Sequence, residues 1–486
     1  MTDATNLARY LSAERPGDET LLVSPTDGAA TRGELRAAVF GLTRAFREQG
    51  LVGARVGLDI TPGFGAVAAY LALLACDNTA VLARRIEQPP WPSYLAAADL
   101  VAVLRARESD RVIEVRRGDE VTTLPLPPVG APPVEDDAID YAVPTRPAVN
   151  LFTSGTTGRP KMVELSHAAL RHSCEAILDR IELAPTTRTA LVLSLAHSFG
   201  LSVLHTHLRA GASLWCVERA EFPGDVLRAF TEGGANAMAG VPTQLRTLTT
   251  SLQRHKGAPV TIDLVLQAGG RMEPDDAAAL LELLTPDARL FPMYGQTEAS
   301  ARIAILPADA VAKVPDSVGL PIRGLEVRVV DEAGDDVPTG EEGEIIVTGP
   351  TLMDGYYRDP DATAEVLRDG WLFTGDIGRV DEDGFLYVSG RRSTFVKLDG
   401  ERISLEAVEH AVLSAHPEVQ DALAVPVKTD RGWAIALEVL APADPRALKE
   451  AVRLAVGRKA VPAAIRVVEK IPYTDNGKKP RPKITY

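Results

Sequence analysis

Leu151-Phe152-Thr153-Ser154-Gly155-Thr156-Thr157-Gly158-Arg159-Pro160-Lys161 is the stretch of this 486-residue sequence that decides the fold. An apolar, strand-like segment (148–152) leads into it, and a helix-like segment opens near Ser166 after it. Such a loop can bind a polyphosphate through backbone N–H groups, hydroxyl groups and a cation. The residues that would provide these groups are Thr153, Ser154, Gly155, Thr156, Thr157, Gly158 and Lys161. The loop is not a Walker loop, because its lysine follows proline and no Ser or Thr comes next. From composition alone, an ordinary turn is the alternative.

Composition indicates a globular enzyme of more than one domain, since 45% of residues are hydrophobic and 24% are charged. The longest apolar run, 65–76, is too short to cross a bilayer, and the first residues lack the pattern of a signal peptide. Three scattered cysteines favour reduced, buried thiols. We therefore expect a cytoplasmic protein with no membrane partner.

Charge is unevenly distributed along the chain. The net charge of −14 disfavours nucleic acid as a partner. From Arg391 onward, 17 Lys and Arg face 12 Asp and Glu, so this part is +5 and residues 1–390 are −19. Ordinary drift in surface composition would explain the basic tail; a segment that handles phosphates or docks an acidic carrier would explain it too.

Alternating helix-like and strand-like segments predict an α/β fold up to about residue 306. A connection with seven prolines and several acids (124–147) interrupts them. From residue 317 short strands with tight turns predict a β-rich subdomain, and a compact α+β piece follows residue 390. The segments expected as helices are 31–50, 274–284, 404–414 and 445–456; those expected as strands are 55–60, 148–152, 189–195, 264–267, 326–330, 344–347, 385–388, 422–427 and 433–440.

The run 151–161 resembles the phosphate loop of the adenylate-forming superfamily, which includes acyl-CoA synthetases, peptide-synthetase adenylation domains and beetle luciferases. The resemblance covers nearly the whole chain and is dense in motifs from Leu151 onward. It implies a large N-terminal domain (1–390) of stacked α/β subdomains plus the β-rich one, and a small mobile C-terminal lid (391–486). It also implies ATP and Mg²⁺ as cofactors.

The nucleotide side of the implied site has three further segments. In Met293-Tyr294-Gly295-Gln296-Thr297-Glu298, the tyrosine could stack on adenine, Thr297 could bond a phosphate oxygen and Glu298 could hold Mg²⁺. Asp376 suits the two ribose hydroxyls, because one carboxylate accepts from both; a turn residue is the alternative. By resemblance Arg391 is a second ribose contact, and Gly269 and Gly270 belong to the nucleotide wall.

The catalytic cation implied by the resemblance is Lys478, within Tyr473-Thr474-Asp475-Asn476-Gly477-Lys478-Lys479-Pro480-Arg481. It would bridge the substrate carboxylate and the α-phosphate. Lid rotation would then bring Lys397 to the thioester-forming side, Gly400 near a pantetheine arm and Arg402 to phosphate. Ser393 stands where many relatives have a hinge Asp or Lys, which leaves the hinge position open.

The acyl pocket follows from Leu195-Ala196-His197-Ser198-Phe199-Gly200-Leu201, by resemblance to a His-x-x-Gly stretch in acyl and aryl ligases. Amino-acid-activating relatives carry Asp where Gly200 stands, so an α-amino acid is disfavoured. The predicted wall comprises His197, Phe199, Gly200, Gly240, Val241, Ala268 and Met293. Arg302 could meet a second anionic group, although a structural ion pair is the more common role. His205 and His207 lack the partners of a metal site.

The resemblance thus implies activation of an acyl or aryl acid to an acyl-AMP with release of pyrophosphate, then transfer to the thiol of CoA. One alternative acceptor is a carrier-protein pantetheine or another nucleophile. A non-catalytic nucleotide-binding relative is the alternative of another class, against which Lys478, Glu298 and Asp376 argue together. The identity of the acid is not encoded in these motifs.

Overall fold

The computed structural model describes residues 5–12, 18–24, 28–88, 91–107, 111–128, 132, 134–135, 138–153, 161–217, 219–257, 259–398, 401–416, 418–429, 432–440 and 443–472. The chain forms two compact units. Unit 1 comprises Met1–Val327, Val347–Leu372 and Asp383–Leu386; unit 2 comprises Arg328–Ile346, Phe373–Glu382 and Tyr387–Tyr486.

An eight-stranded sheet in unit 1 has the order β19-β9-β8-β4-β3-β5-β6-β7. Its central strands β8, β4, β3 and β5 are parallel, and the outer strands are antiparallel. The bounds are β3 Arg55–Asp59, β4 Thr79–Ala83, β5 Ala102–Arg107, β6 Val112–Arg117, β7 Glu120–Pro125, β8 Val149–Thr153, β9 Lys161–Leu165 and β19 Gly355–Tyr356.

A nine-stranded sheet in the same unit has the order β16-β15-β14-β13-β12-β10-β11-β1-β2. The six strands from β14 to β1 are parallel, as expected for strands joined by helical crossovers. The bounds are β1 Thr20–Ser24, β2 Gly28–Thr31, β10 Arg188–Leu191, β11 Ser213–Cys216, β12 Ala237–Gly240, β13 Leu264–Gln267, β14 Arg289–Tyr294, β15 Ala304–Ile305 and β16 Leu320–Pro321.

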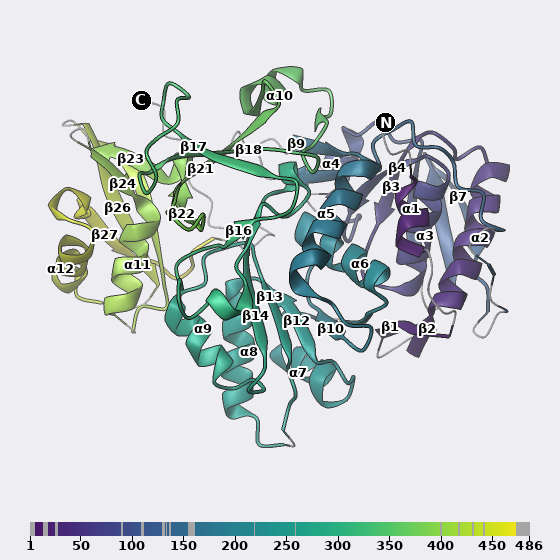
Figure 1. The fold of residues 1–486 in the computed structure, drawn as a ribbon, viewed down its shortest axis with the longest axis horizontal. Helices are drawn as coiled ribbons and strands as arrows, with labels where there is room; N and C mark the ends of the chain where they lie inside the picture. Colours follow the sequence, from purple (N-terminus) through teal and green to yellow (C-terminus); the bar gives the residue numbers. More distant parts are fainter. Residues whose placement is uncertain are drawn as a thin grey trace. The chain divides into compact units, whose positions relative to one another are not determined.

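Helices fill the space around the two sheets. Helices α5 and α6 pack together between them (Figure 1), and α7, α8 and α9 pack in series along the nine-stranded sheet. Helix α3 is apolar on every side and wholly buried, which fits a helix enclosed by neighbours. The bounds are α1 Leu7–Ser12, α2 Arg32–Glu48, α3 Phe64–Ala75, α4 Trp91–Ala96, α5 His167–Ile181, α6 Ser198–Ala210, α7 Pro223–Thr231, α8 Pro242–Arg254, α9 Pro274–Leu281 and α10 Pro360–Val366.

A five-stranded sheet joins β17-β18-β21-β20, with β22 paired to β21. Its long strand β21 carries Asp376, and Gly375 next to it has a φ of +72°, in the region that favours glycine. The bounds are β17 Glu326–Val330, β18 Gly343–Thr348, β20 Leu367–Arg368, β21 Trp371–Val380 and β22 Leu386–Arg391.

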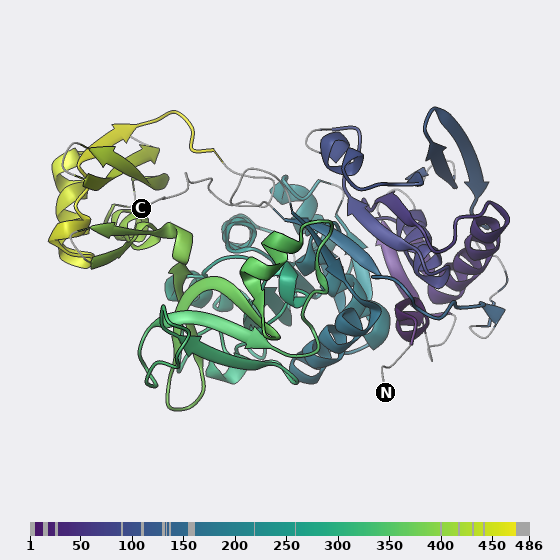
Figure 2. The ribbon, with the colours of Figure 1, turned by 90° about the horizontal axis from the view of Figure 1, so that it is seen from above.

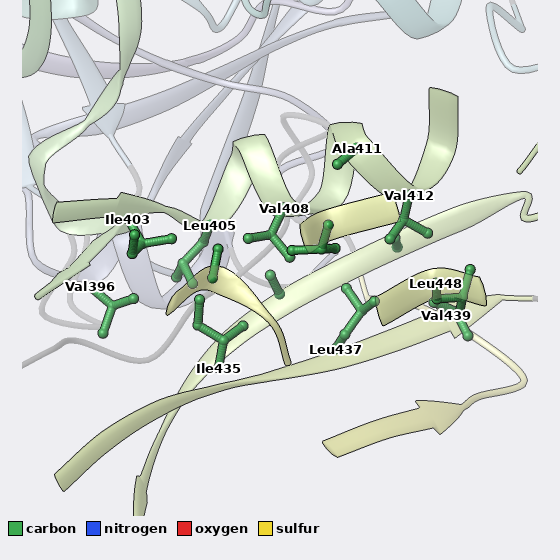
Figure 3. Packing of buried hydrophobic residues seen from close by; sticks show 14 of the residues in the cluster. Val396, Ile403, Leu405, Val408, Ala411, Val412, Ile435, Leu437, Val439 and Leu448 are labelled. Carbon is green, nitrogen blue, oxygen red and sulfur yellow. The ribbon is translucent and has the colours of Figure 1, made fainter. Parts of the chain in front are cut away.

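The C-terminal part of unit 2 has its own hydrophobic core (Figure 3). Buried side chains between Val396 and Ala460 form this core, mainly from α11, β25, β26 and α12. The bounds are β23 Phe395–Leu398, β24 Glu401–Ser404, α11 Leu405–Ala415, β25 Asp421–Thr429, β26 Gly432–Leu440, α12 Pro445–Ala455 and β27 Ala464–Val467. Figure 2 shows these elements (yellow-green to yellow) in a second view. A domain boundary at residue 390 stays a prediction.

The α/β class and the order of elements predicted from the sequence are confirmed. The segment 31–50 contains α2, which begins at a capping box of Thr31 and Glu34. Two segments end earlier than predicted: β10 ends at Leu191, and α9 at Leu281. Among the described residues, no helix is long and apolar enough to cross a membrane.

Candidate active site

Most of the predicted site residues of unit 1 lie where parallel strands end at the same edge of the nine-stranded sheet. Gly240 ends β12, Ala268 follows β13, and Tyr294 ends β14; the register pairs Gly240 with Gln267 and Gln267 with Pro292. Ligands of open α/β sheets bind at the carboxyl ends of the strands. The fold therefore gathers segments that are far apart in the sequence.

The two glycines after β13 leave a bare backbone surface at this edge. Gly269 and Gly270 are exposed, and Gly269 has a φ of +86°. A Cβ atom on Gly269 would lie 3.0 Å from Cγ1 of Val241. The Ala268 N–H donates to the Gly240 carbonyl (3.4 Å), so the predicted wall segments 240–241 and 268–270 contact each other. Their small residues suit a ligand that approaches the backbone.

The Tyr294–Glu298 segment is held by close backbone packing. A Cβ atom on Gly295 would lie 2.1 Å from the Ala301 carbonyl oxygen, so only glycine fits. A short 3-10 helix, η2 (Thr297–Ala299), follows. The Thr297 hydroxyl lies 3.2 Å from the Ser198 hydroxyl at the start of α6. This contact ties the predicted nucleotide segment to the predicted acyl segment.

The Glu298 carboxylate is oriented by Tyr356. The Tyr356 hydroxyl donates to Oε1 of Glu298 at 2.8 Å, and the Lys161 ammonium lies 4.6 Å from the centroid of the same ring. Tyr356 is 7% exposed, whereas Glu298 is half-buried. Glu298 therefore keeps an oxygen for a cation, and its partial exposure suits a Mg²⁺ ion that retains water and phosphate ligands.

The ends of the phosphate loop are paired across two strands. Thr153 and Lys161 are cross-strand partners in β8 and β9, and the Thr153 hydroxyl donates to the Lys161 carbonyl at 3.4 Å. The distance between the two ends is thereby fixed. The remaining predicted loop residues, Ser154, Gly155, Thr156, Thr157 and Gly158, lie outside the described residues.

The acyl segment starts α6, with His197 as its N-cap residue. Phe199 is half-buried, and Gly200 is buried. A Cβ atom on Gly200 would lie 2.2 Å from the Ser194 carbonyl oxygen, so position 200 has no room for an Asp side chain. The glycine is therefore required by packing, and by itself it carries little information about the acid.

Met293 and Phe199 are brought together by Arg302. The Arg302 Nε–H donates to Sδ of Met293 at 3.0 Å, and the guanidinium carbon lies 4.2 Å from the centroid of the Phe199 ring. The ion pair expected as its more common role is not found among the described residues.

In unit 2, the predicted ribose contacts lie together. Nε of Arg391 lies 3.1 Å from Oδ1 of Asp376, on neighbouring strands β22 and β21. Asp376 is 4% exposed and sits within β21, which excludes the alternative of a turn residue. Backbone pairing places Lys397 opposite Arg402 in β23 and β24, but their side chains lie outside the described set, as does all of Lys478.

His205 and His207 are core residues of α6. His205 Nε2 lies 2.8 Å from the Tyr70 hydroxyl, and His207 Nε2 lies 2.7 Å from the Thr189 hydroxyl. Burial lowers the pKa of His205 to about 3 and that of His207 to about 4, so both rings are neutral at pH 7. Within the described residues, no group of three His, Cys, Asp or Glu side chains could hold a metal ion.

Tyr356 is the functional candidate that sequence reasoning missed. It follows Gly355, whose φ is +150°, and pairs with Val163 of β9. The only sequence signal is a Gly-Tyr-Tyr run beyond the β18 segment, which resembles many strand ends. Its proximity to Glu298, 58 residues earlier, appears only in the fold.

The chain is similar to known proteins over most of its length. The family model described as "AMP-binding enzyme" matches residues 10–357, and "AMP-binding enzyme C-terminal domain" matches residues 408–478. The chain is 32% identical to a feruloyl-CoA synthase of Amycolatopsis sp over 360 residues (71% of this chain, 72% of the relative). It is 31% identical to a 2-succinylbenzoate–CoA ligase of Bacillus licheniformis over 404 residues (82% and 80%). Among solved structures, the amide bond synthetase McbA from Marinactinospora thermotolerans superposes with a TM-score of 0.78 at 27% identity (98% and 97%).

Proposed function

The chain belongs to the AMP-binding enzyme family, and from that premise we propose that it activates a carboxylic acid with ATP and transfers the acyl group to the thiol of CoA. It is an AMP-forming ligase whose relatives include acyl- and aryl-acid–CoA ligases. The observation that carries the proposal is the cluster of Lys161, Tyr356 and Glu298, in which Lys161 is the last residue of the phosphate loop. It combines a cation and an oriented carboxylate, which a bound polyphosphate with Mg²⁺ requires.

The first half-reaction forms an acyl-AMP. A substrate carboxylate oxygen attacks the α-phosphorus of ATP, the bond to the bridging oxygen breaks, and pyrophosphate leaves. Lys161 and the loop 153–158 hold the phosphates, Tyr294 stacks on adenine, and Asp376 with Arg391 holds the ribose. Lys478 neutralises the charge that gathers between carboxylate and phosphate. Mg²⁺, held by Glu298 and phosphate oxygens, would offset the negative charge of the triphosphate.

The second half-reaction transfers the acyl group. A thiolate attacks the acyl carbonyl carbon, and AMP leaves with the electron pair of the anhydride bond. In this step residues 391–402 replace the Lys478 segment at the reacting group, with Lys397 and Arg402 near the acceptor. Residues 396–460 pack around a hydrophobic core of their own, so this part would stay folded during such a rearrangement.

The acid pocket is lined by His197, Phe199, Val241, Ala268 and Met293. The guanidinium of Arg302 contacts both Phe199 and Met293. A cation at this place repels the ammonium group of an α-amino acid. The substrate is therefore an acyl or aryl acid without an α-amino group.

A second candidate acceptor is an amine. The similarity to the amide bond synthetase McbA extends over 98% of this chain, which favours an alternative in which the acyl-AMP is captured by nitrogen. A phosphopantetheinylated carrier protein is a third acceptor, compatible with the basic segment from Arg391 onward.

The test separates activation from transfer. Pyrophosphate release is measured across fatty, hydroxy, benzoic and cinnamic acids without any acceptor, with wild type and Lys478→Ala. The best acid is then offered CoA, a phosphopantetheinylated carrier and a primary amine, and the product is identified by mass spectrometry. The proposed activation would be contradicted if none of the acids gave pyrophosphate release, or if Lys478→Ala released it at the wild-type rate. If the product were an amide, the acceptor would be an amine and not CoA.

A further inference from the structure

Arg302 is a buried cation with almost nothing to neutralise it. It is 2% exposed and is among the largest fully buried side chains of the described chain. Burial lowers the pKa of its guanidinium to about 9, so the group is still charged at neutral pH. An isolated charge in an apolar interior is strongly unfavourable unless it is paired and hydrogen-bonded.

The partners that the structure provides are weak. Nε donates to the thioether sulfur of Met293 at 3.0 Å, and Nη1 donates to the carbonyl of the adjacent residue Ala301 at 3.0 Å. The Phe199 ring lies against the guanidinium, a cation–π contact that carries no net charge to neutralise it. A guanidinium has five N–H donors, and no carboxylate in the described part of the chain forms an ion pair with this one.

Arg32 is a second buried arginine of this chain, and its partners can be compared with those of Arg302. It is 5% exposed, and its Nε lies 3.1 Å from Oε2 of Glu19. Its Nη1 donates to the Leu208 carbonyl at 2.9 Å, and its Nη2 donates to those of Ala212 and His207 at 3.2 and 3.3 Å. A carboxylate and three backbone carbonyls thus neutralise and solvate it. Among the described residues, Arg302 has no comparable set of partners.

The backbone before Arg302 is strained in a way that fixes its position. Ser300 and Ala301 have φ angles of +50° and +87°, in the left-handed region that residues with a Cβ rarely adopt. The Ser173 hydroxyl donates to the Ser300 carbonyl at 2.6 Å, and the Ile303 N–H donates to the Tyr294 carbonyl at 2.8 Å. Strained backbone of this kind persists where function requires one orientation.

We infer that the acid carries a second anionic group, and that the guanidinium of Arg302 binds it, so that the enzyme selects dicarboxylic acids over monocarboxylic acids. The inference rests on the proposed function, since Met293 and Phe199 line the proposed acid pocket. The half-exposed Phe199 ring lies between the guanidinium and the surface of the proposed pocket, so the acid would have to displace it. The planar fork of arginine matches a carboxylate with two parallel hydrogen bonds, which neither a sulfur nor a ring replaces.

The test compares matched acids. Straight-chain α,ω-dicarboxylic acids are each paired with the monocarboxylic acid of the same length, and carboxy-substituted cinnamic acids with cinnamic acid. Pyrophosphate release gives kcat/KM for each, and the ratio of diacid to monoacid is the readout. Removing one partner of a buried charge pair costs about 2–5 kcal/mol, or roughly 30-fold or more. We expect the ratio to favour one diacid by roughly 100-fold in the wild type.

Three variants test the residue. Arg302→Met should lower the ratio by roughly 100-fold, and Arg302→Lys, which keeps the charge but not the fork, by less. Arg228→Met removes an exposed arginine of α7 that pairs with Asp225 and Glu232, and should leave the ratio unchanged. Urea unfolding provides a readout besides activity: Arg302→Met should be at least as stable as wild type, because an apolar side chain replaces an unpaired buried charge.

The outcomes are distinguishable. A wild type that prefers the monoacid in every pair overturns the inference, and so does an Arg302→Met ratio equal to the wild-type ratio. Marked destabilisation of Arg302→Met would also overturn it, because the cation would then be compensated within the chain. Pyrophosphate release from none of the acids, mono or di, would contradict the proposed function itself.

Discussion

Removing the hydroxyl of Tyr356 is predicted to weaken binding of Mg·ATP while leaving the fold intact. Tyr356→Phe deletes the donor that holds Oε1 of Glu298 at 2.8 Å. It keeps the aromatic ring against which the Lys161 ammonium lies, because phenylalanine retains the face of the ring. The variant therefore isolates the orientation of one carboxylate.

The magnitude follows from the burial of the two partners. A hydrogen bond to a charged group contributes about 1.5–3 kcal/mol. Glu298 is half-buried, so water replaces part of the lost interaction, and the lower end of the range applies. About 1.5 kcal/mol corresponds to a factor of about 10 in binding. Deleting an outer partner of a metal ligand weakens metal binding by about 10- to 100-fold, which agrees.

Tyr357→Phe is the matched control. The Tyr357 hydroxyl donates to Asp99 at 3.0 Å at an exposed site, so its loss also removes a tyrosine–carboxylate hydrogen bond. Pyrophosphate exchange is measured against free Mg²⁺ at fixed ATP, with thermal unfolding alongside. We expect half-saturation for Mg²⁺ to rise about 10-fold in Tyr356→Phe only. Equal Mg²⁺ dependence in both variants would refute the assignment of Glu298.

The remaining predictions concern the cation, the ribose contact and two glycines. Lys478→Ala should lose roughly 100- to 1,000-fold in pyrophosphate release with unchanged circular dichroism; near wild-type release would remove it from the mechanism. Asp376→Asn should raise KM for ATP about 10-fold, with a smaller increase for 2′-deoxy-ATP, and equal increases for both nucleotides would argue against a ribose contact. Gly200→Ala should lower the free energy of unfolding by about 1–3 kcal/mol, because its methyl group meets the Ser194 carbonyl. Gly41→Ala, in the interior of α2 with no atom within 4 Å of the new methyl group, should instead raise it by about 0.5–1 kcal/mol in urea unfolding.

Local sequence signals predicted much of the fold. The start of α2 is encoded by Thr31 and Glu34 three residues apart, and the start of α5 by Ser166, whose hydroxyl accepts from the Ala169 N–H. The Tyr294–Glu298 segment was recognisable because its groups are contiguous. Each of these features depends on residues within one turn or one loop.

Features that depend on distant residues were not predictable from the sequence. The expected ion pair of Arg302 was wrong for the described residues, because the absence of a carboxylate depends on which segments pack around it. The sequence-based interpretation of Gly200 was incomplete, because it did not include packing. The carbonyl group that occupies the place of a Cβ atom belongs to Ser194, six residues earlier. Tyr356 was missed because strand β19 joins β9 nearly two hundred residues from its own place in the chain.

The hydrophobic core between Val396 and Ala460 draws all its buried side chains from the final fifth of the polypeptide. A graft that exchanges this segment between family members would therefore leave this core whole. The side chains that we propose to select the acid, Phe199, Met293 and Arg302, would remain those of the recipient. Under the proposed function, choice of acid and choice of acceptor would then lie in separately exchangeable stretches of sequence, and exchanging them would give new pairings of acid and nucleophile.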